Sequence, residues 1–321
     1  MTTPSVLNAA LSEKDQFTKY IEQFLASQDV TQGSRQTYHS ALRQFFVWFH
    51  DNNIVNPTRE TILEFKESLD ARGLKPFTRS GYLVAVRRFF EWAETLKLYP
   101  NIAKGIKGAR RAVKTHQKNS LTIDQIEKLL HSIEQKTLVG KRDFALINLL
   151  FRTGLRLIEI KRAQVCDLEP KDDGEGALLW IRGKGRDGKD DFVVVTDDAL
   201  DPIRRYLQQR KSKNTKEPLF ASISDRNYGK YITTQSLSRI IKQRLRAAGI
   251  QSARITAHSL RHTFGVMAIQ AGASLYEVQL AMRHSAPATT EIYLGDIERS
   301  KRLEGGPEKR ISALFDRLKK D

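Results

Sequence analysis

Residues 256–264 of this chain read TAHSLRHTF, a stretch that combines a helix start with several basic side chains. The hydroxyl of Thr256 can cap a helix by accepting a hydrogen bond from one of its first amides. His258 and Arg261, three positions apart, then share one helix face. The positive potential of a helix N-terminus favours a phosphate or another anion beside them. His262 points elsewhere, and we expect it to be structural.

Two further candidates follow towards the C-terminus. His284 comes just after a helix expected over residues 275–282, and Tyr293 lies within the sequence TTEIYLG at 289–295. A tyrosine in such a place is more often a core residue. Phenol has a pKa of about 10, so Tyr293 becomes a useful nucleophile only if cations or a neighbouring base stabilise its phenolate.

Two candidates also precede this stretch. In RTGLR, residues 152–156, a helix ends at Gly154 and Arg156 begins the next turn. Lys184 lies at the tip of a hairpin expected between two β-rich runs, 177–182 and 190–196. Taken alone, the arginine fits a solvated surface residue and the lysine a plain polar turn.

The rest of the chain is predominantly helical in pattern. Four helices are expected between residues 13 and 96, where the apolar residues recur at spacings of three and four. From residue 120 onward, further helices flank the hairpin. The sequence therefore predicts an α+β fold that is mainly α with a small β-sheet.

Charge and spacing divide the chain into four segments. Residues 13–97 form a helical domain, and 98–119 form a basic linker without acidic residues. Residues 120–300 form the second domain. Residues 301–321 form a tail helix with Ile311, Leu314, Phe315 and Leu318 on one face. This tail docks either on its own domain or on a neighbouring protomer.

The composition points to a nucleic acid partner. The chain of 321 residues has a formal net charge of +17, with +7 before Asn119 and +10 from there on. Basic surface on both halves suits DNA touched from two sides, although ribosomal and membrane-surface proteins are also basic. The single cysteine, Cys166, excludes an internal disulfide and a zinc site built on this chain's cysteines, and we expect it to be buried.

The sequence gives no sign of a membrane location. No apolar run approaches the roughly 18 residues that a transmembrane helix needs. Residues 1–10 lack the basic and apolar regions of a secretory signal. We therefore expect the protein in the cytoplasm.

Six of these residues, in this order and context, resemble the catalytic set of the tyrosine recombinases, the group of the phage integrases and the Xer resolvases. RTGLR followed by Glu159, the GKG hairpin, HSLRHTF and ATTEIYLG resemble the family's motifs over nearly the whole chain. The resemblance implies a four-helix, SAM-like core-binding domain and a mixed α/β catalytic domain, without the arm-binding domain of larger integrases. The set consists of Arg156, Lys184, His258, Arg261, His284 and Tyr293.

The resemblance also implies roles for these residues. Arg156 and Arg261 hold the scissile phosphate, Lys184 protonates the leaving 5′ oxygen, and Tyr293 attacks phosphorus. His258 and His284 assist. The product is a 3′-phosphotyrosine intermediate, for integration, excision, resolution or transposition of DNA. It implies no cofactor, metal or ATP, and it implies a homotetramer on paired sites in double-stranded DNA, with accessory proteins as further partners.

Two departures from the family pattern stand out. The family usually has Leu-Gly-His where residues 282–284 of this chain read Met-Arg-His, so Arg283 replaces a glycine. After the hairpin, residues 188–193 read GKDDFV, where the family commonly has another basic residue and a proline. Both departures concern local geometry and leave the six residues in place.

Two other functions remain open. A DNA-binding architectural or regulatory protein without catalysis fits the charge and the helices equally well. A type IB topoisomerase uses similar tyrosine chemistry on a single duplex. The intact set of six residues argues against the first, and assembly of several protomers would argue against the second.

Overall fold

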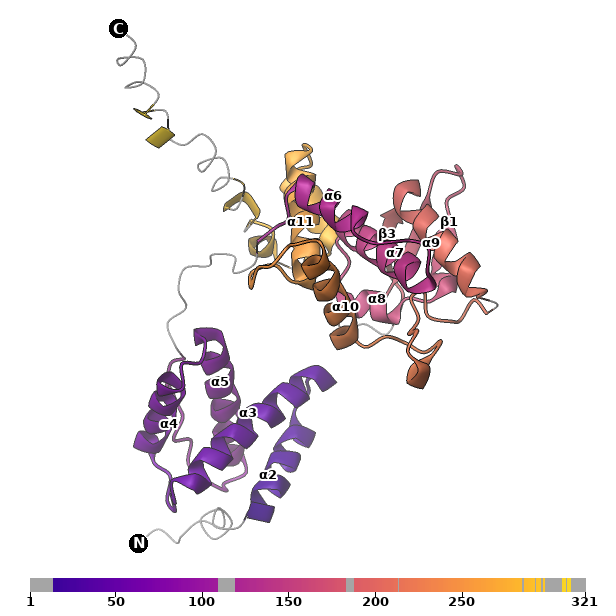
Figure 1. Cartoon of the computed structure of the whole chain (residues 1–321). Coiled ribbons are helices and arrows are strands. Elements are labelled where there is room, and N and C mark those ends of the chain that lie inside the picture. The colour runs from indigo at the N-terminus through magenta and orange to yellow at the C-terminus, as the bar shows by residue number, and fades with distance from the viewer. Residues whose placement is uncertain are drawn as a thin grey trace. The chain divides into compact units, whose positions relative to one another are not determined.

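The computed structural model describes residues 14–108, 119–182, 188–212, 214–284, 286–291, 293–295, 297, 308, 309, 311 and 312. The chain divides into two compact units, residues 1–114 and 115–321. Both units are mainly helical, and the second also contains a small sheet (Figure 1). The predicted fold class is therefore confirmed.

The first unit contains the four predicted helices. They are α2 (Lys14–Ser27), α3 (Gln32–Asp51), α4 (Arg59–Ala71) and α5 (Pro76–Thr95). Thr31 caps α3 by accepting a hydrogen bond from the amide of Ser34 at 3.3 Å. Pro76 takes the first position of α5, where the missing amide hydrogen costs no helical bond.

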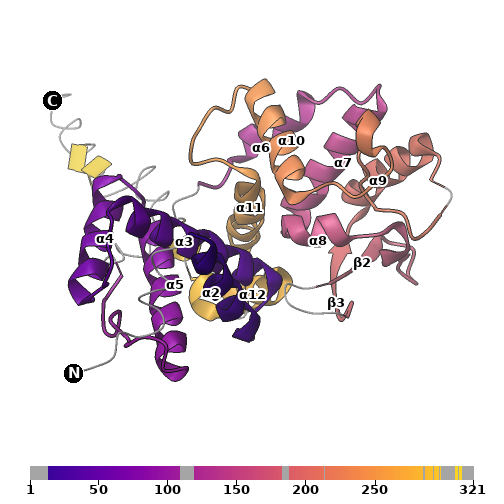
Figure 2. The same cartoon turned by 90° about the horizontal axis from the view of Figure 1, so that it is seen from below.

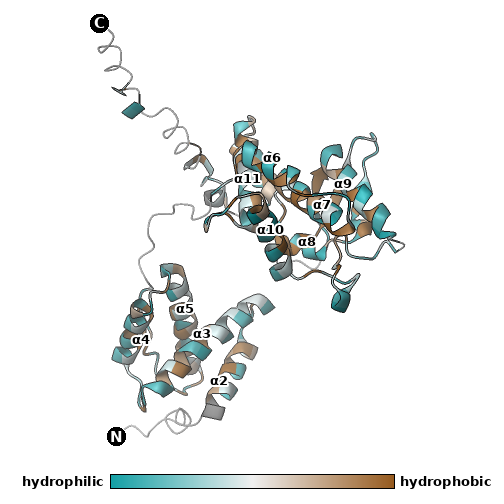
Figure 3. Ribbon diagram, in the orientation of Figure 1, coloured by the Kyte–Doolittle hydropathy of each residue, from teal (hydrophilic) through white to brown (hydrophobic). Residues whose placement is uncertain are grey.

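Phenylalanines dominate the core of this unit. Rings from all four helices meet edge to face, as do Phe45 and Phe65, whose centroids are 5.0 Å apart. Each such pair stabilises the core by about 1 kcal/mol beyond the burial of its surface. Apolar and polar residues share each helix, as amphipathic packing requires (Figure 3).

The expected linker begins inside this unit. Ala103 and Ile106 are buried in the phenylalanine core, and Leu98, Tyr99 and Ile102 pack against it. The prediction of an extended linker is therefore wrong for residues 98–106, because their apolar side chains complete the core despite the surrounding basic charge. Residues 109–118 lie outside the described residues.

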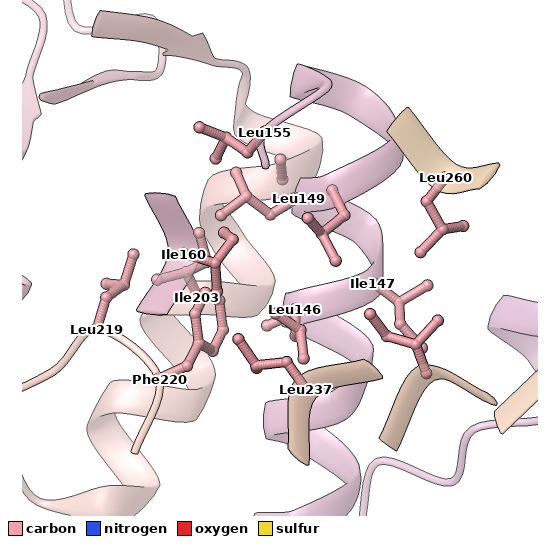
Figure 4. Packing of buried hydrophobic residues seen from close by; sticks show 14 of the residues in the cluster. Leu146, Ile147, Leu149, Leu155, Ile160, Ile203, Leu219, Phe220, Leu237 and Leu260 are labelled. Atoms are coloured by element: carbon pink, nitrogen blue, oxygen red, sulfur yellow. The ribbon is translucent and has the colours of Figure 1, made fainter. Parts of the chain in front are cut away.

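The second unit is built around α7 (Leu138–Thr153). Leu146, Ile147 and Leu149 point from it into a core shared with the helices on either side (Figure 4). The neighbouring helices are α6 (Ile123–His131), α8 (Leu157–Arg162), α9 (Asp197–Arg210), α10 (Thr234–Ala247), α11 (Ala257–Gln270) and α12 (Leu275–Met282). Of these, α6, α9, α10 and α11 contact α7 directly, and α12 packs on α11 (α12 is labelled in Figure 2).

The sheet has three antiparallel strands in the order β1 (Leu168–Pro170), β2 (Ala177–Ile181) and β3 (Asp191–Val195). Leu179 of β2 pairs with Val193 of β3, and alternate residues of β2 face the core. The predicted hairpin is thus confirmed, with its tip at residues 183–187 outside the described part of the chain. The short strand β1 was not predicted.

The surroundings of Cys166 differ from what the sequence predicts. Cys166, in the 3-10 turn Val165–Asp167, is exposed, so the prediction that it is buried is wrong. Its neighbour Asp167 occupies the buried position instead and caps the turn by accepting a hydrogen bond from the amide of Gln164.

Within the described ranges, no helix is both long and apolar enough to cross a bilayer.

Candidate active site

Gly154 sets the position of Arg156. It ends α7 with a φ of 61°, in the left-handed region that glycine adopts without strain. A Cβ there would lie 2.6 Å from Cδ1 of Phe264 on α11, so the close approach also requires glycine. Leu155, the next residue, is buried in the core of the second unit. Arg156 follows at the N-cap of α8, with its guanidinium half-buried.

Arg261 lies on the first turns of α11 and is buried, only 2% exposed. Its guanidinium donates to the carbonyl oxygens of Gly154 and Met282, which end α7 and α12. Burial, together with the charge of Arg156, lowers the pKa of Arg261 to about 10. The group therefore remains charged at neutral pH.

A buried carboxylate joins the arginines. Glu159 accepts from Nη1 and from the backbone amide of Arg156, at 2.9 and 2.7 Å, and from Nη2 of Arg283 at 2.9 Å. Burial acts to raise the pKa of Glu159, but the charge of Arg283 and the hydrogen bonds from Arg156 outweigh it. The pKa lies below its usual value, so Glu159 is ionised.

His284 follows α12 and is held by Thr290. Its Nδ1 lies 2.9 Å from the Thr290 hydroxyl oxygen. Burial, followed by the charges of Arg261, Arg156, Arg283 and His258, lowers the pKa of His284 to about 4. The imidazole is therefore neutral at pH 7, and one ring nitrogen is fixed by the threonine.

Tyr293 is buried beside α11 and is 4% exposed. Its ring centroid lies 4.8 Å from that of His262 and 6.1 Å from that of His284. The ring packs over Gly265, where a Cβ would lie 2.6 Å from Cε2 of Tyr293. The phenol is close enough to Arg261 to favour the charged form of the arginine.

The structure therefore gathers five of the six predicted residues. Arg156, Arg261, His284 and Tyr293 meet through the contacts above, and His258, exposed on the first turn of α11, lies near enough to act electrostatically on His284. Lys184 lies outside the described residues. His262 is buried, as a structural residue should be, but it packs against the tyrosine.

Two residues of the cluster were not predicted as site residues. Glu159 was noted only as part of the motif, and Arg283 only as a departure from it. One signal was present, because Glu159 lies three positions after Arg156 at a helix start, the spacing of a capping box. Nothing in the sequence places Arg283 beside Glu159, 124 positions away.

This arrangement suits chemistry on a phosphodiester. Two charged guanidiniums and a neutral imidazole offer donors to non-bridging oxygens, and their charges stabilise a phenolate. Among the described residues, no group of three or more His, Cys, Asp or Glu side chains is placed to hold a metal ion. The site is thus a cationic cluster with one tyrosine packed against it.

Both units match models of one family. Residues 119–298 match the phage integrase family, and residues 16–97 match the phage integrase N-terminal SAM-like domain. The chain belongs to the phage integrase family. This phage integrase family member is a site-specific tyrosine recombinase, as its motifs predicted, and none of the comparisons favours a catalytically silent protein.

Its relatives in sequence are tyrosine recombinases. One from Synechococcus elongatus is 27% identical over 84% of this chain and 87% of its own length. XerD of Vibrio cholerae serotype O1 is 26% identical over 85% of this chain and 90% of its own. The similarity therefore spans both units of this phage integrase family member.

Solved structures share the fold. XerH recombinase bound to a palindromic difH substrate, in a post-cleavage complex, gives a TM-score of 0.70 at 24% identity, over 91% of this chain and 84% of that one. A lambda integrase tetramer bound to a Holliday junction gives 0.65 at 15% identity, over 91% and 81%. These structural neighbours are DNA-bound recombinases with the architecture of this family member.

Proposed function

We propose that this recombinase cleaves and rejoins double-stranded DNA with Tyr293 as nucleophile. The observation that carries the proposal is the packing of Tyr293 beside the cluster of Arg156, Arg261 and His284. These side chains come from three separate parts of the second unit. Such convergence is what in-line attack on a phosphate requires.

The proposed reaction conserves bond energy. The phenolic oxygen of Tyr293 forms a bond to phosphorus, and the bond to the 5′ oxygen breaks. His258 accepts the phenol proton, and Lys184 gives a proton to the departing 5′ oxygen. The 3′-phosphotyrosine is later attacked by a 5′ hydroxyl from the partner strand. One ester replaces another, so the exchange consumes no ATP.

The remaining three residues stabilise the charge that develops on the phosphate. Arg261 remains charged at neutral pH, and the guanidiniums of Arg156 and Arg261 each offer several N–H donors in a fixed plane. The neutral His284 donates one hydrogen bond to a non-bridging oxygen, and Thr290 holds its other nitrogen. Donors fixed before the reaction need no reorganisation during it.

Strand exchange requires two sites, so the working assembly is a tetramer of this chain on paired DNA sites. The reaction takes place in the cytoplasm, and accessory proteins are further partners.

The tail at residues 301–321 docks on a neighbouring protomer. Of the tail, residues 308, 309, 311 and 312 are described, and Ile311 is 54% exposed. The support for this docking is the sequence of the tail, in which Ile311, Leu314, Phe315 and Leu318 recur at helical spacing.

Covalent capture tests the chemistry directly. The protein is incubated with fragmented DNA of its host or element in the presence of chelator, denatured, and the DNA ends attached to protein are sequenced. Adducts at one site, lost in Tyr293→Phe, are expected. Tight binding without any adduct, even on a nicked duplex, would contradict the proposal. Relaxation of a plasmid that carries a single site, without products joined between duplexes, would point to a topoisomerase.

A further inference from the structure

Arg283 has a backbone conformation that favours glycine. It caps α12 with φ 55° and ψ 50°, one of four non-glycine residues with positive φ in the described part of the chain. The Cβ of an L-residue is crowded in this region, so an arginine here is held against a local preference. Contacts of the Arg283 side chain therefore have to stabilise this backbone conformation.

Those contacts are part of the active site. Nη2 of Arg283 donates to Oε2 of Glu159 at 2.9 Å, and Nη1 donates to the carbonyl oxygen of Ala281 at 2.6 Å. The side chain is 10% exposed and Glu159 is fully buried. The carbonyl oxygen of Arg283 in turn accepts from Nη2 of Arg156 at 3.0 Å. Arg156 is thus held from both sides by Glu159 and Arg283.

The charges show what the extra arginine changes. Among the described residues, Glu159 forms ion pairs with Arg156 and Arg283, so without the side chain of Arg283 its carboxylate would face Arg156 alone of this pair and would offset much of the charge of Arg156. With Arg283 present, the same carboxylate pairs with two cations. More of the positive potential of Arg156 is then available to a phosphate. Arg283 also fixes the carboxylate to which Arg156 is bonded.

We propose that Arg283 is a positioning residue for DNA cleavage, which acts through Glu159 to orient Arg156 and to leave its charge available to the scissile phosphate. This inference rests on the proposed function. Arg283 itself is not required to touch DNA. Its effect belongs to the chemical step, where charge builds up on the phosphate, and only weakly to the affinity for DNA, which many phosphate contacts share.

The test compares variants on a nicked duplex that carries the site recovered by covalent capture. Arg283→Gly suits the backbone and removes the guanidinium. We expect its single-turnover cleavage rate at saturating protein to fall about tenfold, with the affinity for DNA within about twofold of the parent. Arg283→Lys keeps the charge and should recover part of the rate. Equal rates for all three proteins would overturn the proposal.

Lys211 provides a matched control. It caps α9 in the same left-handed conformation, with φ 54°, and is exposed. Lys211→Gly removes the same kind of backbone strain, along with one positive charge, away from the Glu159 cluster. Its cleavage rate should equal that of the parent. If Lys211→Gly slowed cleavage as much as Arg283→Gly, strain or net charge would explain the effect and the proposal would fail.

A double-mutant cycle identifies the route. If Arg283 acts through Glu159, then Arg283→Gly should change the rate less than about twofold in a Glu159→Gln background. A tenfold loss in that background as well would mean that Arg283 acts independently of Glu159, which contradicts the proposal. Thermal melts of each variant verify folding. The proposed function fails separately, when the parent protein itself forms no adduct.

Discussion

Gly265 and Tyr293 lie so close together that any side chain at position 265 would overlap the tyrosine ring. A Cβ on Gly265 would lie 2.6 Å from Cε2 and 2.9 Å from Cδ2 and Cζ of Tyr293. Real carbon atoms do not approach so closely, so either the ring or α11 would have to shift. The position of the proposed nucleophile thus depends on the absence of a Cβ atom at position 265.

Gly265→Ala should therefore impair cleavage by displacing Tyr293. Displacement of the attacking oxygen by about 1 Å can cost about a hundredfold in rate, and we expect a loss of that order in covalent adduct formation on the captured site. DNA affinity should change little. Gly81→Ala is the matched control, because Gly81 also lies within a helix but has nothing within 4 Å of its Cβ position.

Gly81→Ala should keep full cleavage and raise the free energy of unfolding by about 0.5–1 kcal/mol, since alanine favours helix over glycine. Chemical denaturation measures this difference. Unchanged cleavage in Gly265→Ala, with a correctly folded protein, would show that the ring adjusts without cost to the reaction.

Tyr293→Phe should bind DNA like the parent protein and form no adduct. The change removes one oxygen atom and leaves the basic surface, with its release of counterions, untouched. Gel-shift titration measures binding, and denaturing electrophoresis measures adducts. Any covalent DNA formed by Tyr293→Phe would assign the nucleophile to another residue.

Arg261→Ala should lose both cleavage and stability. It removes a buried charged donor and leaves the carbonyl oxygens of Gly154 and Met282 without it. We expect the free energy of unfolding to fall by about 2–3 kcal/mol, while the loss in DNA affinity stays much smaller than the loss in cleavage. Arg205→Ala, at an exposed position of α9, should change stability by less than about 0.5 kcal/mol.

The neutral state of His284 predicts a pH dependence. Its pKa is about 4 in the folded chain and about 6.5 in an unfolded one. Between these values the unfolded chain takes up the proton first, so the stability that depends on neutral His284 is present above pH 6.5 and is lost as the pH falls to 4.

His284→Gln should accordingly lose less stability than the parent between pH 6.5 and 4. Urea denaturation at a series of pH values gives the difference, and the imidazole resonances of His284 give its pKa directly. A measured pKa near 6.5 would contradict the electrostatic description of the cluster.

Most of the fold follows from local sequence patterns. The helix predicted over 275–282 agrees with α12, which the structure shows to be capped by Ser274. The hairpin strands were also predicted, from β-rich runs on either side of a glycine-rich turn. In contrast, β1 has three residues, one of them a proline, and carries too little pattern to detect.

The predictions that failed involve contacts made across the chain. Residues 98–106 look like a linker because basic residues, and no acidic ones, lie in and around them in the sequence. The core that buries Ala103 and Ile106 is formed by helices that lie elsewhere in the chain. Likewise, Arg283 reads as an anomaly in sequence, and only the folded chain brings it to Glu159. Six candidate site residues could be named from motifs, but the lowered pKa values of Arg261 and His284 depend on burial that no motif states.

The hydrogen bonds of Arg261 have a consequence for copies of this recombinase gene that accumulate mutations. Because one guanidinium both joins the ends of α7 and α12 and takes part in the proposed chemistry, the fold itself maintains this arginine even where recombination is no longer selected. At position 293, phenylalanine would keep the ring that packs over Gly265 and beside His262. In degenerating copies of this gene, we expect the tyrosine to be lost well before the arginine.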